Sequence, residues 1–273
     1  MRRAPAAALA ALLTSSCGAR LMKLPQGPGT AASDARDALA EATVACHAVL
    51  SLTAEIAVSG SVSGRRLRAT LNVGVAQPDL ARLEAFALGQ PMFLFVARGS
   101  DATLLLQRDN RILEHGPPDA ILQAVTGVPL KPSTLKSTLT GCATAADWRE
   151  AQELGPDWRM LTDIDGSVYL HRTARQAPWQ LVAALYRDPA RGEWRAEYRK
   201  ISGGVARDIQ LTSTDRKRFD LRLVLSQVET NVSLDAEALV RVQIPPSADR
   251  ITLEELRRAG PLGVVSSTDP DGR

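Results

Sequence analysis

The sequence has few of the residues that bind metals or carry out catalysis. Among 273 residues there are only three cysteines and three histidines, and His47, His115 and His171 lie far apart in the chain. No Cys-x-x-Cys or His-Glu-x-x-His spacing occurs, so no metal site is expected. A Gly-rich phosphate loop and a Gly-x-Ser-x-Gly nucleophile motif are absent as well. We therefore expect a protein that is not an enzyme and that has no cofactor.

Lysine is scarce and the net charge is small. Only five of the 33 basic residues are lysines, and 30 acidic residues leave a formal net charge of +3. This balance gives no electrostatic reason to bind nucleic acid. Beyond the N-terminus, no apolar run approaches the roughly 20 residues that cross a bilayer as a helix. Any attachment to a membrane would therefore be through lipid.

The first 17 residues contain a positive start, an apolar stretch and small residues before a cysteine. Arg2 and Arg3 precede the run Ala4–Leu13, and Thr14–Ser16 lead into Cys17. This order is typical of a secretory signal. A cysteine at the cleavage point resembles a bacterial lipobox, in which the thiol is acylated. We expect Cys17 to be the lipidated N-terminus, and the alternative is an ordinary signal peptide with a chance cysteine.

The composition divides the chain into four parts. Residues 1–16 are expected to be the signal peptide, and 17–33, which contain Pro25 and Pro28, a flexible tether. One domain is expected over residues 34–262, followed by a disordered polar tail over 263–273.

Two cysteines remain once Cys17 is set aside. Cys46 and Cys142 are an even pair in an oxidising compartment, which favours a disulfide. Two buried free thiols are the alternative.

Two short motifs have a catalytic or metal-binding interpretation that we consider weak. Ser133–Lys136 fits Ser-x-x-Lys at the start of a helix, but the companion Ser-Asp-Asn and Lys-Thr-Gly motifs are missing. Asp163–Gly166 begins like a calcium loop but lacks the third acid and the terminal Glu. A helix start and a strand turn are the preferred interpretations.

Hydrophobic periodicity predicts a helix, then strands, two helices and further strands. The predicted helices are Asp34–Val49 (capped by Ser33 or Asp34), Pro117–Gly127, Pro132–Gly141 and Leu253–Arg258. The predicted strands are Leu52–Ser59, Arg66–Val75, Leu80–Ala87, Met92–Ala97, Ala102–Gln107, Arg111–Glu114, Trp158–Asp163, Ser167–Arg172, Trp179–Arg187, Trp194–Ile201, Ala206–Thr214, Phe219–Glu229 and Val240–Ile244. A turn over Ser59–Gly64 joins the first two strands.

This order indicates an α+β fold with one large curved antiparallel sheet. About 11–12 strands seldom stay flat, so a half-barrel is expected, with two to four short helices over its concave face. Phe93–Val96 and Leu104–Leu106 are apolar on both faces. Either both faces of these strands are covered by protein, or one face lines an apolar cavity.

The element order resembles that of the LolA/LolB-like superfamily of lipoprotein carriers and receptors, and is most similar to the LolB-like branch. Gly127–Leu130 and Leu139–Gly141 fit the Gly-x-Pro-Leu and Leu-x-Gly ends of two helices in that family. Gly166–Leu170 and the run Ala236–Pro245 also look similar. The resemblance covers Asp34–Leu262.

The resemblance implies binding of acyl chains rather than catalysis. It implies a hydrophobic cavity of several hundred Å³, the usual ligand scale. The expected lining residues are Phe86, Phe93, Phe95, Leu104, Leu106, Ile121, Leu122, Val125, Leu135 and Leu139. It further implies that Leu88, which matches a membrane-touching leucine on a loop, contacts the membrane, and that the helices of Cys46 and Cys142 meet at the concave face.

The function expected from these observations is that of a monomeric, lipid-anchored protein on the periplasmic face of the outer membrane. It would bind acyl chains of lipids or lipoproteins, help to localise lipoproteins and receive them from a periplasmic carrier protein. A general periplasmic lipid carrier and a structural envelope lipoprotein that contacts protein partners are the first two alternatives. A third is an envelope hydrolase, which would need a nucleophile with a base beside it.

Overall fold

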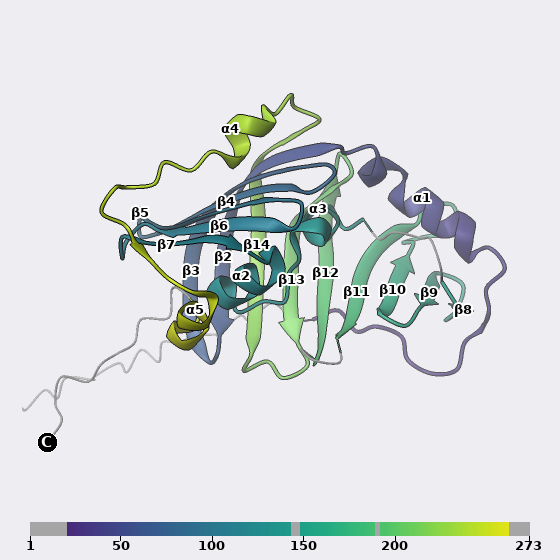
Figure 1. Ribbon diagram of the computed structural model, residues 1–273. Helices are drawn as coiled ribbons and strands as arrows, with labels where there is room; N and C mark the ends of the chain where they lie inside the picture. The colour runs from purple at the N-terminus through teal and green to yellow at the C-terminus, as the bar shows by residue number, and fades with distance from the viewer. Residues whose placement is uncertain (1–20, 143–147, 189–191, 262–273) are drawn as a thin grey trace, which may run out of the picture.

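The structure, a computed structural model, describes residues 21–142, 148–188 and 192–261. The expected signal peptide, Cys17 and the tail over 263–273 lie outside these ranges. The described residues form fifteen strands and five helices (Figure 1). The helices are α1 (Ala35–His47), α2 (Pro118–Thr126), α3 (Pro132–Thr140), α4 (Ala236–Val240) and α5 (Leu253–Ala259). The strands are β1 (Thr30–Ala31), β2 (Ser51–Val62), β3 (Arg65–Ala76), β4 (Leu80–Ala87), β5 (Gln90–Arg98), β6 (Asp101–Leu106), β7 (Arg111–Gly116), β8 (Glu150–Glu153), β9 (Trp158–Thr162), β10 (Gly166–His171), β11 (Gln180–Asp188), β12 (Gly192–Ser202), β13 (Val205–Ser213), β14 (Phe219–Thr230) and β15 (Asp249–Arg250).

All strands belong to one sheet that does not close into a barrel. Its order is β1-β8-β9-β10-β11-β12-β13-β14-β2-β3-β4-β5-β6-β7-β15. Every neighbouring pair is antiparallel except β7 and β15, which are parallel. This confirms the α+β fold and the large curved antiparallel sheet. The additional strands β1, β8 and β15 have two to four residues each, too few for a periodic signal.

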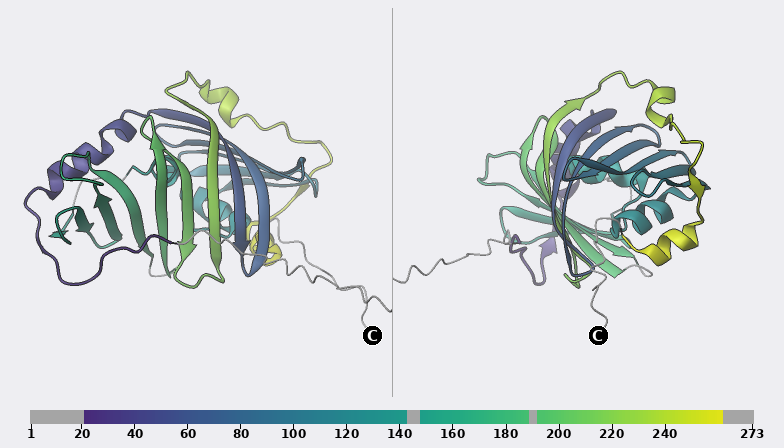
Figure 2. Two further views of the ribbon diagram at one scale, coloured as in Figure 1. Left: turned by 180° about the vertical axis from the view of Figure 1, so that it is seen from behind. Right: turned by 90° about the vertical axis from the view of Figure 1, so that its left-hand side faces the viewer.

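Four helices lie on the concave face of the sheet, and α4 lies on the other face (Figure 2). The core is continuous along the concave face, because inward side chains of β2 (Ile56), β5 (Phe95) and β13 (Ile209) share one buried cluster with the helices. Helix α1 packs over β8–β11, whereas α2, α3 and α5 fill the opening between the central strands and the β4–β7 end.

The convex face of β5–β7 is covered by the C-terminal segment. Leu94, Leu105 and Ile112 form a second buried cluster there, against which Val242 and Ala248 pack. The two-sided apolar pattern of these strands therefore results from protein on both faces. The prediction of a strand over residues 240–244 was wrong. Helix α4 ends at Val240, and residues 241–248 cross this face of the sheet without pairing with it, before β15.

The N-terminal segment covers the convex face at the opposite end of the sheet. Met22 and Leu24 pack on a third cluster that contains Tyr169 and Val182. Further along, β1 pairs with β8 at the edge of the sheet. Residues 21–33, expected to be part of a flexible tether, therefore lie along the domain.

One turn and one helix cap differ from what the sequence predicts. The first hairpin turn is shorter than residues 59–64, because both strands continue to Ser63 and Gly64, which have φ of 50° and 74° as in a two-residue type I′ turn. Asp34 lies at the N-cap of α1 without a capping bond from its side chain. Its carboxylate instead accepts hydrogen bonds from Arg159 at 2.7 and 2.9 Å.

Candidate binding cavity

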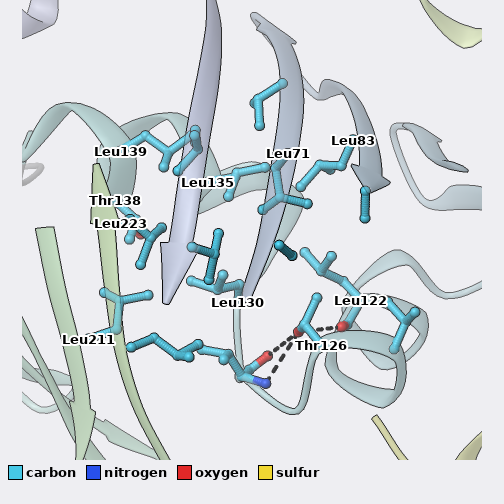
Figure 3. Close-up of a pocket in the computed structure, with 18 of the residues that line it drawn as sticks. Leu71, Leu83, Leu122, Thr126, Leu130, Leu135, Thr138, Leu139, Leu211 and Leu223 are labelled. Carbon is cyan, nitrogen blue, oxygen red and sulfur yellow. Dashed lines mark hydrogen bonds between the residues drawn. The ribbon is translucent and has the colours of Figure 1, made fainter. Parts of the chain in front are cut away.

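An apolar cavity lies between the concave face of the sheet and helices α2 and α3. Strands β2–β5, β13 and β14 form one wall, and α2, α3 and the loop between them form the other (Figure 3). Every lining side chain is apolar except those of Thr126 and Thr138. The cavity therefore offers a ligand a hydrocarbon surface.

The two threonine hydroxyls form hydrogen bonds within the protein. The Thr126 Oγ1 donates to the carbonyl of Leu122 at 2.7 Å and accepts from the backbone N–H of Val128 at 3.2 Å. These two bonds are among the dashed lines in Figure 3. Thr138 shares a hydrogen bond with Tyr186, whose pKa is raised by burial. Because these polar groups have protein partners, the cavity does not select for a polar ligand.

Five of the ten residues expected to line a cavity do so. Phe93 on β5, Leu122 and Val125 on α2, and Leu135 and Leu139 on α3 all contribute to its wall.

The other five residues do not line the cavity. Phe95, Leu104, Leu106 and Ile121 are buried in the close-packed part of the same core cluster. Phe86 is half-buried and belongs to neither the cavity wall nor the core, because it follows the inward Ala85 on an alternating strand.

Sequence reasoning missed the contribution of the central strands. Ile56, Leu71, Ile209, Leu211 and Leu223 also line the cavity. The signal was present, since each is one of the apolar positions of a period-2 strand. The prediction instead placed the cavity wall on the strands that are apolar on both faces. On those strands the second apolar face packs against the C-terminal segment.

The cavity is smaller than expected. Its volume is about 90 Å³, whereas typical ligand sites enclose about 300–1,000 Å³. An acyl chain of ordinary length therefore does not fit this volume unless the cavity wall moves outward.

One side of the cavity is more exposed than the others. Its half-exposed lining residues include Leu67, Ala69 and Leu71 on β3 and Met92 on β5. The pairing of β3 with β4 begins only at Thr70, so within the described residues the first part of β3 has no strand partner on that side. We define this gap between β3 and the β4–β5 hairpin as the cavity mouth.

Leu88 lies on the hairpin turn beside the cavity mouth. The turn consists of Leu88 and Gly89, with φ of 51° and 75°, and the side chain of Leu88 is 100% exposed. A leucine with positive φ costs on the order of 1–2 kcal/mol relative to glycine. This turn therefore keeps a large apolar side chain in water at a conformational cost.

Helix α3 is fixed at several points along its length. The Nζ of Lys136 donates to the carbonyl of Val49 at 2.6 Å, and burial lowers the pKa of Lys136. Gly141, the left-handed C-cap of α3, lies against the ring of Tyr198. The following residue, Cys142, is joined to Cys46 of α1 by a disulfide, which confirms the predicted pair.

The structure also places the two weak motifs. Ser133 is exposed on α3, and the ammonium group of Lys136 contacts Val49. Asp163 Oδ1 accepts from the backbone N–H groups of Asp165 and Gly166 at 2.8 and 2.9 Å, as in a strand turn. Within the described ranges no group of three or more His, Cys, Asp or Glu side chains is placed to hold a metal ion.

None of the helices in the described part of the chain combines the length and apolarity needed to cross a membrane.

Comparison with known protein families and with curated protein sequences finds no match by sequence. Comparison with solved structures does find similar folds. A LolA superfamily protein from Nitrosomonas europaea superposes with a TM-score of 0.52 at 10% identity, covering 76% of this chain and 97% of the other. The chain therefore shares its fold with this protein.

Two more distant structures also superpose in part. One is a domain of an outer membrane lipoprotein-sorting protein from Vibrio parahaemolyticus, with a TM-score of 0.43 at 8% identity over 75% of this chain and 95% of the other. The other is the lipoprotein LppX from Mycobacterium tuberculosis, with a TM-score of 0.33 at 11% identity over 75% and 100%.

Proposed function

We propose that this protein binds the acyl chains of lipids or lipoproteins in the cavity between its sheet and helices α2 and α3. The observation that carries the proposal is the apolar lining of that cavity, with its mouth beside the exposed Leu88. The fold supports it, because the Nitrosomonas europaea protein with the same architecture belongs to the LolA superfamily. The activity is binding and transfer, with no catalytic step.

The energetics favour an acyl chain as the ligand. Each methylene that leaves water gains about 0.8 kcal/mol, so a chain of several carbons can offset a moderate cost of widening the cavity. The widening is expected at α2 and the loop 127–131, because α3 is held by the disulfide, Lys136 and the contact of Gly141 with Tyr198.

The location proposed for this activity is the periplasmic face of the outer membrane. Cys17 would carry the lipid that anchors the protein there, and Leu88 would touch the bilayer from which a chain enters the mouth. In this role the protein, as a monomer, would accept lipoproteins from a periplasmic carrier and assist their localisation, as the LolB-like branch of the superfamily would.

The small volume of the cavity favours a second candidate function. A structural envelope lipoprotein would use the same fold to contact protein partners, and it would need no space for a ligand. A volume of about 90 Å³ is compatible with a core that never opens.

Lipid extraction and mass spectrometry of the protein, purified from its native membrane, separate the two functions. The proposed function predicts a stoichiometric acyl-containing molecule that remains after detergent exchange, and mature protein that begins at an acylated Cys17. Protein that is free of lipid, and that takes up no fluorescent fatty acid afterwards, would contradict the binding function and support the structural role.

A further inference from the structure

The N-terminal segment meets the domain very close to the expected lipid. The backbone N–H of Met22 donates to both carboxylate oxygens of Glu197 at 3.0 Å, and its carbonyl accepts from Arg195 at 2.6 Å. Glu197 is fully buried, so this attachment is part of the folded domain. Leu21 lies in a groove with Trp194 and Arg216, near the start of β12.

The distance from this point to Cys17 is limited by the chain itself. Four residue steps separate Cys17 from Leu21, and at about 3.5 Å per step they span at most about 14 Å. If Cys17 carries the lipid, the part of the domain around Leu21 must lie within that distance of the headgroup region. With that lipid in the membrane, the edge of the sheet against which Leu21 packs would face the membrane.

Two hairpin tips at this edge are rich in cations. The β2–β3 turn and the β13–β14 turn are joined by backbone bonds of 2.8 Å from Ser63 to Arg218 and from Gly64 to Lys217, and both tips point the same way in Figure 1. Residues 63–68 and 214–218 contain six cationic side chains and one carboxylate, all of them exposed. We name these cations the basic rim: Arg65, Arg66, Arg68, Arg216, Lys217 and Arg218.

The charge of the basic rim is not a general property of the surface. The single acid among these residues, Asp215, accepts a hydrogen bond of 3.0 Å from the backbone N–H of Lys217 and shapes the turn. At the same edge, the β9–β10 tip carries Asp163 and Asp165. On the opposite edge, Asp79 follows β3 and Asp101 begins β6, and the cations Arg175 and Lys200 lie there on separate elements.

We propose that the basic rim binds the anionic phospholipid headgroups of the membrane that the N-terminal lipid enters. This inference rests on the proposed lipid anchor, and it adds an orientation to the proposed function. Exposed cations beside a membrane surface are attracted by anionic lipid within about one Debye length, and the guanidinium group pairs well with phosphate. Because Leu67 at the cavity mouth lies on β3 between Arg66 and Arg68, docking of the rim brings the mouth close to the bilayer.

Vesicle sedimentation tests the rim without the anchor. The chain from residue 17 with Cys17→Ser, which retains every described residue, is mixed with vesicles of phosphatidylcholine alone or with added phosphatidylglycerol. We expect binding only to vesicles with phosphatidylglycerol, and loss of binding at high salt. The triple variant Arg66→Gln, Arg68→Gln and Lys217→Gln should bind at least about tenfold more weakly.

A matched variant removes the same number and kind of charges elsewhere. Arg36→Gln, Arg175→Gln and Lys200→Gln lie on α1 and near the opposite edge of the sheet, and this variant should bind as the parent does. Equal vesicle binding by the two triple variants, or binding that does not depend on phosphatidylglycerol, would overturn the inference.

Binding of a fluorescent fatty acid, measured on the same proteins, distinguishes this inference from the proposed function. Retained fatty-acid binding in the rim variant, together with weakened vesicle binding, supports both. Rim-dependent vesicle binding by a chain that takes up no fatty acid supports the rim and removes the cavity function.

Discussion

Cys46 and Cys142 join the last turn of α1 to the end of α3, with their Cα atoms 5.6 Å apart and a sequence separation of 96 positions. Both are buried. Since α3 carries Leu135 and Leu139 to the cavity wall, the bond fixes the end of the helix that forms part of the cavity roof. The two helices of the cavity wall therefore differ in restraint, because α2 and the loop after it have no such crosslink among the described residues.

Removing the disulfide should lower stability substantially. The chain-entropy account gives about 4–5 kcal/mol for a loop of this length, with measured values of about 2–5 kcal/mol for native disulfides. We expect the free energy of unfolding of the double variant Cys46→Ala and Cys142→Ala, measured by urea denaturation, to be lower by an amount in that range. Reduction of the parent protein serves as the control and should give the same shift; an unchanged midpoint in both would contradict the prediction.

Much of the fold could be predicted because its local signals agree with its tertiary structure. The left-handed caps Gly127 and Gly141 end α2 and α3 where the sequence placed them. The period-2 strands β4 and β9–β14 were located to within two residues at each end. Local pattern and long-range pairing indicate the same structure in these segments.

The failures occur where tertiary contacts replace the local signal. Val242 is apolar and follows an alternating pattern, yet it covers another strand's convex face and does not pair with the sheet. Met22 lies in a Pro- and Gly-containing segment without periodicity, yet its backbone binds the buried Glu197. A sequence pattern contains no information on partners that are 175 residues away.

The same reasoning explains which cavity residues could be predicted. Four of the five residues expected on α2 and α3 line the cavity, because an amphipathic helix has only one buried face; Ile121 is the exception. On β4–β6, the choice between close-packed core and cavity depends on the distance to the opposite wall. Phe93 lines the cavity and Phe95, two residues later on the same face, does not.

A charge at the cavity mouth should block acyl-chain binding. Leu71→Arg places a guanidinium at a half-exposed lining position, where the side chain can reach water without unfolding the core. We expect the affinity for a fluorescent fatty acid to fall at least about tenfold, since burying a cation beside hydrocarbon is unfavourable. Leu80→Arg is the matched control, a half-buried leucine on the adjacent β4 that does not line the cavity. Equal affinities in the two variants would argue against the cavity as the binding site.

Replacing Leu88 should raise stability and weaken membrane contact. Asparagine accepts positive φ more readily than leucine, so Leu88→Asn is expected to stabilise the protein by roughly 0.5–1 kcal/mol. The same change removes the fully exposed apolar side chain next to the mouth. Compared with the parent, Leu88→Asn should therefore transfer a fluorescent acyl chain between vesicles more slowly and have a higher melting temperature. A parallel loss of transfer and stability would contradict this separation.

Stability should fall as the pH drops below about 4–5. Hydrogen bonds from Arg159 hold the pKa of Asp34 below its usual value, and those from Arg222 do the same for Asp208. A carboxyl whose pKa is lower in the folded state stabilises the fold above its unfolded pKa of about 3.9, and this contribution is lost as the pH falls through the folded value.

The variant Asp34→Asn with Asp208→Asn tests this origin of the acid sensitivity. Its urea midpoint at pH 7 should be lower than that of the parent, because Arg159 and Arg222 lose their partners. Between pH 5 and pH 3 its midpoint should change less steeply. If both proteins lose stability with the same slope, other carboxylates are responsible.

Releasing Met22 should free the N-terminal segment from the domain. Glu197 accepts from Met22 and also pairs with Arg195 at 2.6 Å and Arg199 at 2.7 Å. In Glu197→Gln one of the two acceptor oxygens becomes a donor and the charge is lost, which we expect to destabilise the protein on the order of 3 kcal/mol.

Local release can be separated from this global effect by limited trypsin digestion at a temperature where both proteins are folded. Cleavage after the exposed Lys23 should be faster in Glu197→Gln than in the parent. Glu193→Gln, on the same strand but paired with Arg187 at the surface, should leave the rate unchanged. Because a freed segment lengthens the connection to Cys17, a lipidated Glu197→Gln protein should also lose the fixed orientation of its basic rim at the bilayer. Unchanged cleavage after Lys23 would show that Glu197 does not hold the segment, and the limit of about 14 Å between lipid and domain would no longer apply.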